Sequence, residues 1–472
     1  MPLAYPHSAL HRFCRRVLAA LLAASGLCSL PLNAATTATT GSAALCQAEP
    51  GVLSLSRSLY ADKLQGFWLG LSIGNWTGLI TEMDKIGGEG PASVFYTRND
   101  WGGADQPSIW GQGIPSELSK TIDWYLVKGD TPWGSDDDSD IEYIYLQLMY
   151  QSGQPLLTAE QIRDGWMQHI YTDQQTPFRS KEGGPENFLW VSNQQAFDLM
   201  QQGIKPPFTG MPQWNPHYDM IDAQLTTELF GALAPGRPDI AAQLAYLPIR
   251  TTAYGEAADI AQFYVDLYAL SATIDPQQAL APQLLRIAAQ ARQNLPANQY
   301  PAKMYDFVQS QYLAGVPWEQ VRDALYRRYQ LEQQDGYLIS GKKLYCNGCF
   351  AAGINYAASL VSYFYGAGDM QQTLKIAVLA GWDSDNPTAT WGGLYGLILG
   401  KSGVDKLFGP NLSDNFNIHR TRKGFANNGL DNFNAMAGKG IDIVDKVVTG
   451  LMGGKIDQAN GCYLIPGSIQ AN

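Results

Sequence analysis

Helical periodicity dominates wherever apolar residues recur regularly along this chain. Apolar side chains repeat with helical spacing over residues 141–149, 260–268 and 318–325. This spacing places them on one face of an α-helix. Breaks rich in Gly and Pro separate such runs, as at 205–207 and 235–238. No alternating run predicts a β-sheet, so we expect an all-α fold in a single domain.

Two segments depart from this regular pattern. Residues 346–368 carry no charged side chain, but asparagines and serines interrupt the stretch. It therefore predicts a buried core helix with its lead-in, and we expect no stable membrane insertion. Residues 86–134 contain many Gly, Trp and Asp residues without a clear period. They predict an irregular loop on the substrate side of the molecule.

The first residues predict a targeting segment. Three arginines precede the apolar run 17–27, and Ala34 offers a small residue at a cleavage site. The apolar run is too short to span a bilayer comfortably. We therefore expect a cleaved signal peptide at 1–34, a flexible lead-in at 35–55 and a helical domain at 56–472. The protein would then be periplasmic or secreted.

Cysteine usage agrees with an oxidising compartment. Outside the targeting segment the cysteines are Cys46, Cys346, Cys349 and Cys462. An even number predicts two disulfides, one joining the chain ends through Cys46 and Cys462 and one closing Cys346 on Cys349. A redox-active CxxC is an alternative, although a thioredoxin-like βαβ context is missing. A zinc site is less favoured, because no second ligand pair accompanies the CxxC.

The composition adds an acidic, lightly charged surface. Charged residues make up 16% of the chain, and the formal net charge is −11. Proteins that bind nucleic-acid backbones carry basic patches, so we expect no nucleic-acid partner. An anionic substrate must instead be met locally, by a cation or by backbone amides. We expect the protein to act as a monomer.

Two acidic stretches stand out in a chain with so few charges. Residues 134–140 read Gly-Ser-Asp-Asp-Asp-Ser-Asp, and residues 381–387 read Gly-Trp-Asp-Ser-Asp-Asn-Pro. Helix capping explains one acidic residue at a helix start, and solvated caps are one interpretation. Three consecutive aspartates repel one another, and neither stretch supplies a positive charge to offset this. A hard divalent cation is the other interpretation. An EF-hand loop is excluded, since no Glu stands twelfth from Asp136.

Two further features have a structural and a functional interpretation. Gly66, Gly70, Gly74 and Gly78 recur every four residues and would share one helical face. They predict close contact with another helix rather than contact with a ligand. Trp382, beside the second acidic stretch, would either stack on a base or pack in the core.

Four segments, in order along the chain, resemble the ADP-ribosylglycohydrolase family. The family's glycine-rich helix signature, which ends in Glu, is similar to residues 66–82. Its Thr-Asp-Asp-Thr motif is similar to 136–139, and its closing Gly-Asp-Thr-Asp-Thr motif is similar to 382–386. Residues 221–264 are similar to a divergent branch. The resemblance covers most of residues 60–400 and implies an orthogonal helical bundle.

The resemblance implies a hydrolase that cleaves an N- or O-glycosidic bond of an ADP-ribosyl or related ribosyl group. Two divalent cations would assist, Mg²⁺ or Mn²⁺, with Ca²⁺ as an alternative. The implied ligands are Asp136, Asp137, Asp138, Asp383, Asp385 and Asn386. Asp138 and Asp385 are the candidates for the catalytic base, and Glu82 would contact the ribose or gate the site. The implied partner is an ADP-ribosylated protein or a ribosyl small molecule.

Three positions depart from the family pattern. Asn75 stands where the family has Asp, Asp136 where it has the first Thr, and Asn386 where it has the last Thr. Each substitute still offers an oxygen ligand, but Asp136 adds a carboxylate that would change metal preference. Two alternatives therefore stay open. One is a non-catalytic nucleotide- or sugar-binding protein of the same fold, and the other is a hydrolase of another glycoside or nucleoside.

Overall fold

The computed structural model describes residues 46, 50–111, 116–180, 183–338, 346 and 348–467. The expected signal peptide at 1–34 lies outside these residues, as does most of the expected lead-in at 35–55. The end of that lead-in is ordered: residues from Val52 onward form a strand.

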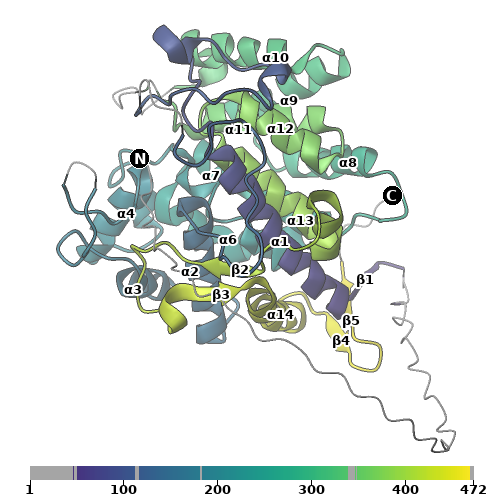
Figure 1. Ribbon diagram of the computed structural model, residues 1–472. Helices are drawn as coiled ribbons and strands as arrows, with labels where there is room; N and C mark the ends of the chain where they lie inside the picture. Colours follow the sequence, from purple (N-terminus) through teal and green to yellow (C-terminus); the bar gives the residue numbers. More distant parts are fainter. Residues whose placement is uncertain are drawn as a thin grey trace, which may run out of the picture.

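The described chain is mostly helical, as expected (Figure 1). The helices are α1 (Arg57–Gly78), α2 (Asp137–Ser152), α3 (Ala159–His169), α4 (Val191–Gln201), α5 (Leu229–Ala232), α6 (Pro238–Thr252), α7 (Glu256–Ser271), α8 (Leu280–Arg292), α9 (Tyr300–Leu313), α10 (Trp318–Leu325), α11 (Ala352–Gly366), α12 (Met370–Ala380), α13 (Asp385–Phe408) and α14 (Phe433–Gly450). The three periodic runs of the sequence fall in α2, α7 and α10. The all-α prediction is thus confirmed.

Short strands supplement the helices, and the sequence pattern did not predict them. They are β1 (Val52–Ser56), β2 (Asn415–Asn417), β3 (Leu430–Asn432), β4 (Lys455–Asp457) and β5 (Cys462–Pro466). The strand β5 lies between β1 and β4 in one antiparallel sheet, and β2 pairs with β3. These strands are too short for an alternating pattern to stand out. Moreover, β1 finds its partner at the opposite end of the chain.

Both expected disulfides are present. Cys46 is bonded to Cys462 of β5, and Cys346 is bonded to Cys349. The first bond holds the segment before β1 to the strand with which β1 pairs. The second links two cysteines three positions apart, ahead of α11.

The centre of the molecule is a glycine-lined contact between α1 and α13 (Figure 1). A Cβ atom added at Gly66, Gly70 or Gly74 would come within 3.0 Å of the α13 backbone. The reverse holds for Gly392 and Gly396, whose added Cβ atoms would meet the α1 backbone. Only residues without a side chain allow two helices to approach this closely. The predicted role of the α1 glycines is therefore confirmed.

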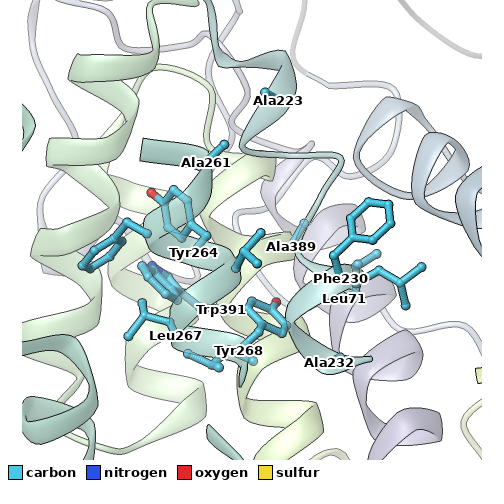
Figure 2. Close-up of a cluster of buried hydrophobic side chains, with 14 of the residues drawn as sticks. Leu71, Ala223, Phe230, Ala232, Ala261, Tyr264, Leu267, Tyr268, Ala389 and Trp391 are labelled. Carbon is cyan, nitrogen blue, oxygen red and sulfur yellow. The ribbon is translucent and has the colours of Figure 1, made fainter. Parts of the chain in front are cut away.

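An aromatic layer packs against the α1–α13 pair (Figure 2). Tyr264 and Tyr268 of α7 lie beside Trp391 of α13, and the Tyr264 and Trp391 rings are 5.6 Å apart. The Tyr268 hydroxyl donates to the backbone carbonyl of Thr390. Because the Tyr268 hydroxyl is hydrogen-bonded, its ring can be buried without leaving that hydroxyl unpaired.

The uncharged segment 346–368 contains α11, which is almost entirely buried, so its prediction as a core helix is confirmed. Among the described residues, no helix combines the length and the apolar character needed to cross a bilayer. The described part of 86–134 is irregular apart from two short 3₁₀ turns, Gly90–Ser93 and Arg98–Asp100.

The contact between α1 and α13 can be tested with one methyl group. Gly70→Ala should lower the free energy of unfolding by about 3 kcal/mol, the upper end of typical overpacking costs, because the new Cβ would meet the Gly392 backbone. Gly438→Ala is the matched control, since its Cβ on α14 would meet nothing within 4 Å. The control should stabilise the protein by up to about 1 kcal/mol through helix propensity. Urea unfolding measures both, and equal effects would contradict the proposed role.

Candidate metal centre

The first acidic stretch forms the start of α2. Asp136 is the N-cap of the helix, and its Oδ1 accepts a hydrogen bond from the Asp138 backbone N–H at 3.2 Å. Asp136 and Asp138 are buried and Asp137 is half-buried. One carboxylate oxygen from each of these three residues lies within 4.8 Å of the other two. Capping and clustering therefore coexist, and capping accounts for only one of the three carboxylates.

A second trio of carboxylates gathers where α1 ends and α13 begins. Glu82 lies in the turn that follows α1, Asp383 precedes α13, and Asp385 is its first residue. Oxygens from the three side chains lie within 4.8 Å of one another. Asp383 and Asp385 are buried, and Glu82 is half-buried.

The second trio is held together by backbone contacts around Trp382. The Trp382 N–H donates to the carbonyl of Lys85 at 2.7 Å, and the Met83 N–H donates to the carbonyl of Trp382 at 2.9 Å. Trp382 has a positive φ of 59°, an unfavourable conformation for a large side chain that neighbouring contacts must hold in place. Its ring is fully buried and packs on Phe95, with centroids 4.8 Å apart. Trp382 is therefore a packing residue and is not exposed for stacking on a base.

The two acidic stretches meet through Asn386 and Asp138. Asn386 Nδ2 donates to Asp138 Oδ1 at 3.3 Å, although the residues are 248 positions apart. Gln224 Nε2 in turn donates to Asn386 Oδ1 at 3.1 Å. All the residues that the sequence suggested as ligands thus lie in the two trios or contact one of them.

Two of the departures from the family pattern contact each other. Asn75 Nδ2 on α1 donates to both carboxylate oxygens of Asp136, at 3.0 and 2.9 Å. An Asp at position 75 would place a second carboxylate against Asp136. The Asn75 amide instead offers a donor. The carboxylate of this contact therefore comes from Asp136 at the start of α2 and not from α1. The departures at positions 75 and 136 therefore form one complementary pair.

Asp140, the last acidic residue of the first stretch, lies outside the cluster. It forms an ion pair with Arg422 at 2.8 Å, and both side chains are fully buried. Arg422 also donates to the backbone carbonyls of Asn187 and Phe188. This pairing assigns Asp140 to a structural role.

Burial and mutual repulsion disfavour the charged forms of the clustered carboxylates. Burial, the largest cause, raises the pKa of Asp136 and of Asp385 from 3.8 to about 7. The pKa values of Asp137, Asp138, Asp383 and Glu82 are also raised well above their ordinary values, by burial first and by neighbouring carboxylates second. Among the described residues, no lysine or arginine forms an ion pair with any of these six.

The donors present suit a hard divalent cation. Carboxylate and amide oxygens are the ligands preferred by Mg²⁺, Mn²⁺ and Ca²⁺. Several buried oxygens at the site have no hydrogen-bond partner in the described structure, namely Asp385 Oδ1, Asn75 Oδ1 and Ser135 Oγ. Buried polar atoms are normally satisfied, so these point to a bound group. The residues that could hold it are Glu82, Asp136, Asp137, Asp138, Asp383, Asp385 and Asn386.

Sequence reasoning missed three residues that hold the site together. Gln224 contacts Asn386, Arg422 neutralises Asp140, and Asn355 Oδ1 accepts the Asp383 backbone N–H at 3.3 Å. The sequence around Asn355 did indicate a hydrogen-bonding role, because a polar residue inside a buried apolar helix must find a hydrogen-bond partner. For Arg422 no local signal exists, since its partner lies far away along the chain.

Comparison with known proteins finds a family model that covers most of the chain. The family model described as ADP-ribosylglycohydrolase matches residues 56–423. A solved structure titled ADP-ribosylglycohydrolase-related protein complex is 15% identical, with a TM-score of 0.44. That match covers 82% of this chain and 98% of the other. No curated protein matches.

The raised pKa values predict how pH and metal together affect stability. Between pH 3.8 and about pH 7, Asp136 and Asp385 bind more protons in the folded protein than they do in the unfolded chain. Their contribution to stability is therefore lost as pH rises through about 7, and a cation should restore it. The increase in Tm on replacing chelator with Mn²⁺ should grow from pH 5.5 to pH 8. Asp385→Asn should reduce this growth. An increase that stays constant with pH would contradict the prediction.

The Asn75–Asp136 pair predicts a compensating double substitution. Asn75→Asp should destabilise the metal-free protein by about 1–3 kcal/mol at pH 8, because a buried donor becomes a second carboxylate. Adding Asp136→Thr should recover most of that loss, since it removes the repulsion. Thermal unfolding of the two single variants and the double variant gives the coupling energy. Additive losses would show that the two positions act independently.

Proposed function

The chain belongs to the ADP-ribosylglycohydrolase family, and from that premise we propose that it is a metal-dependent hydrolase of ribosyl glycosidic bonds. The bond would be the N- or O-glycosidic bond of an ADP-ribosyl or related ribosyl group. One observation carries the proposal: two acidic stretches, remote in sequence, come into contact through Asn386 and Asp138. A family member without a use for this site would gain nothing from gathering six mutually repelling carboxyl groups, of which Asp137 and Glu82 are half-buried and the others buried.

The proposed metals are two divalent cations, Mg²⁺ or Mn²⁺. Bound there, they would supply Lewis acidity and neutralise negative charge around the substrate. The proposed ligands are Asp136, Asp137, Asp138, Asp383, Asp385 and Asn386. Asn75 and Gln224 would orient Asp136 and Asn386, to which they are hydrogen-bonded.

The chain's own residues would then manage the proton and the substrate. An ionised Asp138 or Asp385 would accept a proton from a water molecule while the oxygen of that water bonds to the anomeric carbon. The bond from that carbon to the leaving nitrogen or oxygen breaks, the leaving group takes up a proton from solvent, and the aspartate returns the proton it accepted to solvent. Glu82 is half-buried and lies beside Asp385, so it is suited to contact a ribose hydroxyl.

We further propose that the protein acts outside the cytoplasm, in the periplasm or after secretion. The sequence pattern predicts a signal peptide, and two disulfides support an oxidising compartment. The substrate would then be a ribosylated molecule that is present in that compartment.

Turnover and metal binding can be separated in one experiment. The purified protein is stripped with chelator, and ADP-ribose or ribose release is measured from modified protein and from nucleosides, with Mg²⁺, Mn²⁺ or Ca²⁺. Asp137→Ala and Asp385→Ala should each reduce turnover at least about 10³-fold, since several kcal/mol of charge stabilisation is lost. Asp164→Ala, at an exposed acid on α3, should have no effect.

The outcomes distinguish the proposed function from its rivals. Tight metal binding by the wild type without cleavage of any substrate would favour a binding protein of the same fold. Cleavage of nucleosides alone would favour a nucleoside hydrolase. Full activity of Asp385→Ala would show that the assigned site is wrong.

A further inference from the structure

We propose that Asn355 is a positioning residue of the metal centre and that the Cys346–Cys349 disulfide holds it in place. The inference rests on the proposed function, because it assigns these residues to the support of metal ligands. Asn355, Cys346 and Cys349 would not themselves touch metal or substrate. Their contacts reach both Asp383 and Asn386.

Asn355 connects α11 to the start of the second acidic stretch. Its Oδ1 accepts the Asp383 backbone N–H at 3.3 Å. Asp383 lies in the turn between α12 and α13, outside any helix, so its N–H has no intrahelical carbonyl to bind. The Asn355 amide supplies the acceptor and thereby helps to fix the position of Asp383 within the second trio.

The opposite side of the Asn355 amide is held by the disulfide turn. Its Nδ2 donates to the carbonyls of Cys349 at 2.7 Å and Ala351 at 3.0 Å. Asn355 is 1% exposed and Cys349 is fully buried, so water cannot replace these bonds. The Cys346–Cys349 bond closes the turn that presents the Cys349 carbonyl. Covalent closure limits how far that carbonyl can move, and the amide transmits this restraint to Asp383.

A second connection runs to Asn386 from the residues that directly follow Cys349. Residues 350–352 pair with 219–221: the Ile221 N–H donates to the Phe350 carbonyl at 2.9 Å, and the Ala352 N–H donates to the Asp219 carbonyl at 3.0 Å. A 3₁₀ turn, Ile221–Ala223, follows directly and leads to Gln224. Gln224 donates to Asn386 Oδ1. One disulfide turn thus supports two proposed ligands by separate routes.

The other disulfide provides a matched control. Cys46–Cys462 joins the segment before β1 to β5, at the edge of the helical body (Figure 1). No residue of β1, β4 or β5 belongs to the candidate metal centre. Removing this bond should affect stability and leave the geometry of the metal ligands unchanged.

The test measures Mn²⁺ affinity by titration calorimetry on chelator-stripped protein, well below the Tm of every variant. Asn355→Ala and the double variant Cys346→Ser/Cys349→Ser should each weaken Mn²⁺ binding about 10- to 100-fold, the usual effect of losing a residue that orients a ligand. Combining all three substitutions should weaken binding by less than the product of the two separate losses, because the disulfide and Asn355 share the route to Asp383. The control Cys46→Ser/Cys462→Ser should lower Tm and leave Mn²⁺ affinity unchanged.

Each result decides the inference. Wild-type affinity in Cys346→Ser/Cys349→Ser or in Asn355→Ala would overturn it. Effects of the disulfide and of Asn355 that simply add would also overturn it, as would an equal loss of affinity in the control variant. Absence of Mn²⁺ binding by the wild type would overturn both this inference and the proposed function.

Discussion

The close contact between α1 and α13 is the constraint on which the rest of the structure depends. Because glycines line both helices, their backbones lie almost against each other along several turns. The C-terminal end of α1 therefore reaches the first residues of α13, and Glu82 lies beside Asp385. Asn75, on the same helix, reaches Asp136 at the start of α2. A wider helix spacing would separate the groups that form the candidate site.

The site gathers charge that the protein alone does not neutralise. Asp140 has Arg422 as its partner, whereas the neighbouring Asp136 has only the amide of Asn75 and a backbone N–H. The difference explains why one carboxylate is structural and the others are available for a cation. The two departures from the family pattern are complementary, since the amide donor of Asn75 on α1 faces the carboxylate of Asp136 ahead of α2.

The sequence was most informative where structure is local. Helical spacing predicted α2, α7 and α10, and the acidic residues stand out because the chain contains few charges. The strand β1 could not be predicted, because its stability comes from pairing with β5 at the far end of the chain. The roles of Gln224, Asn355 and Arg422 could not be predicted for the same reason. Their roles depend on which distant residue the fold brings to them, and neither residue type nor spacing reveals that.

The bond between Cys46 and Cys462 joins positions 416 residues apart, so nearly the whole folded polypeptide is a covalent ring. A protease that nicks one exposed loop would open the ring without releasing a fragment. The severed ends would remain attached through the disulfide and through the core that both halves share. This circular connectivity would let a molecule that has been cut once stay assembled.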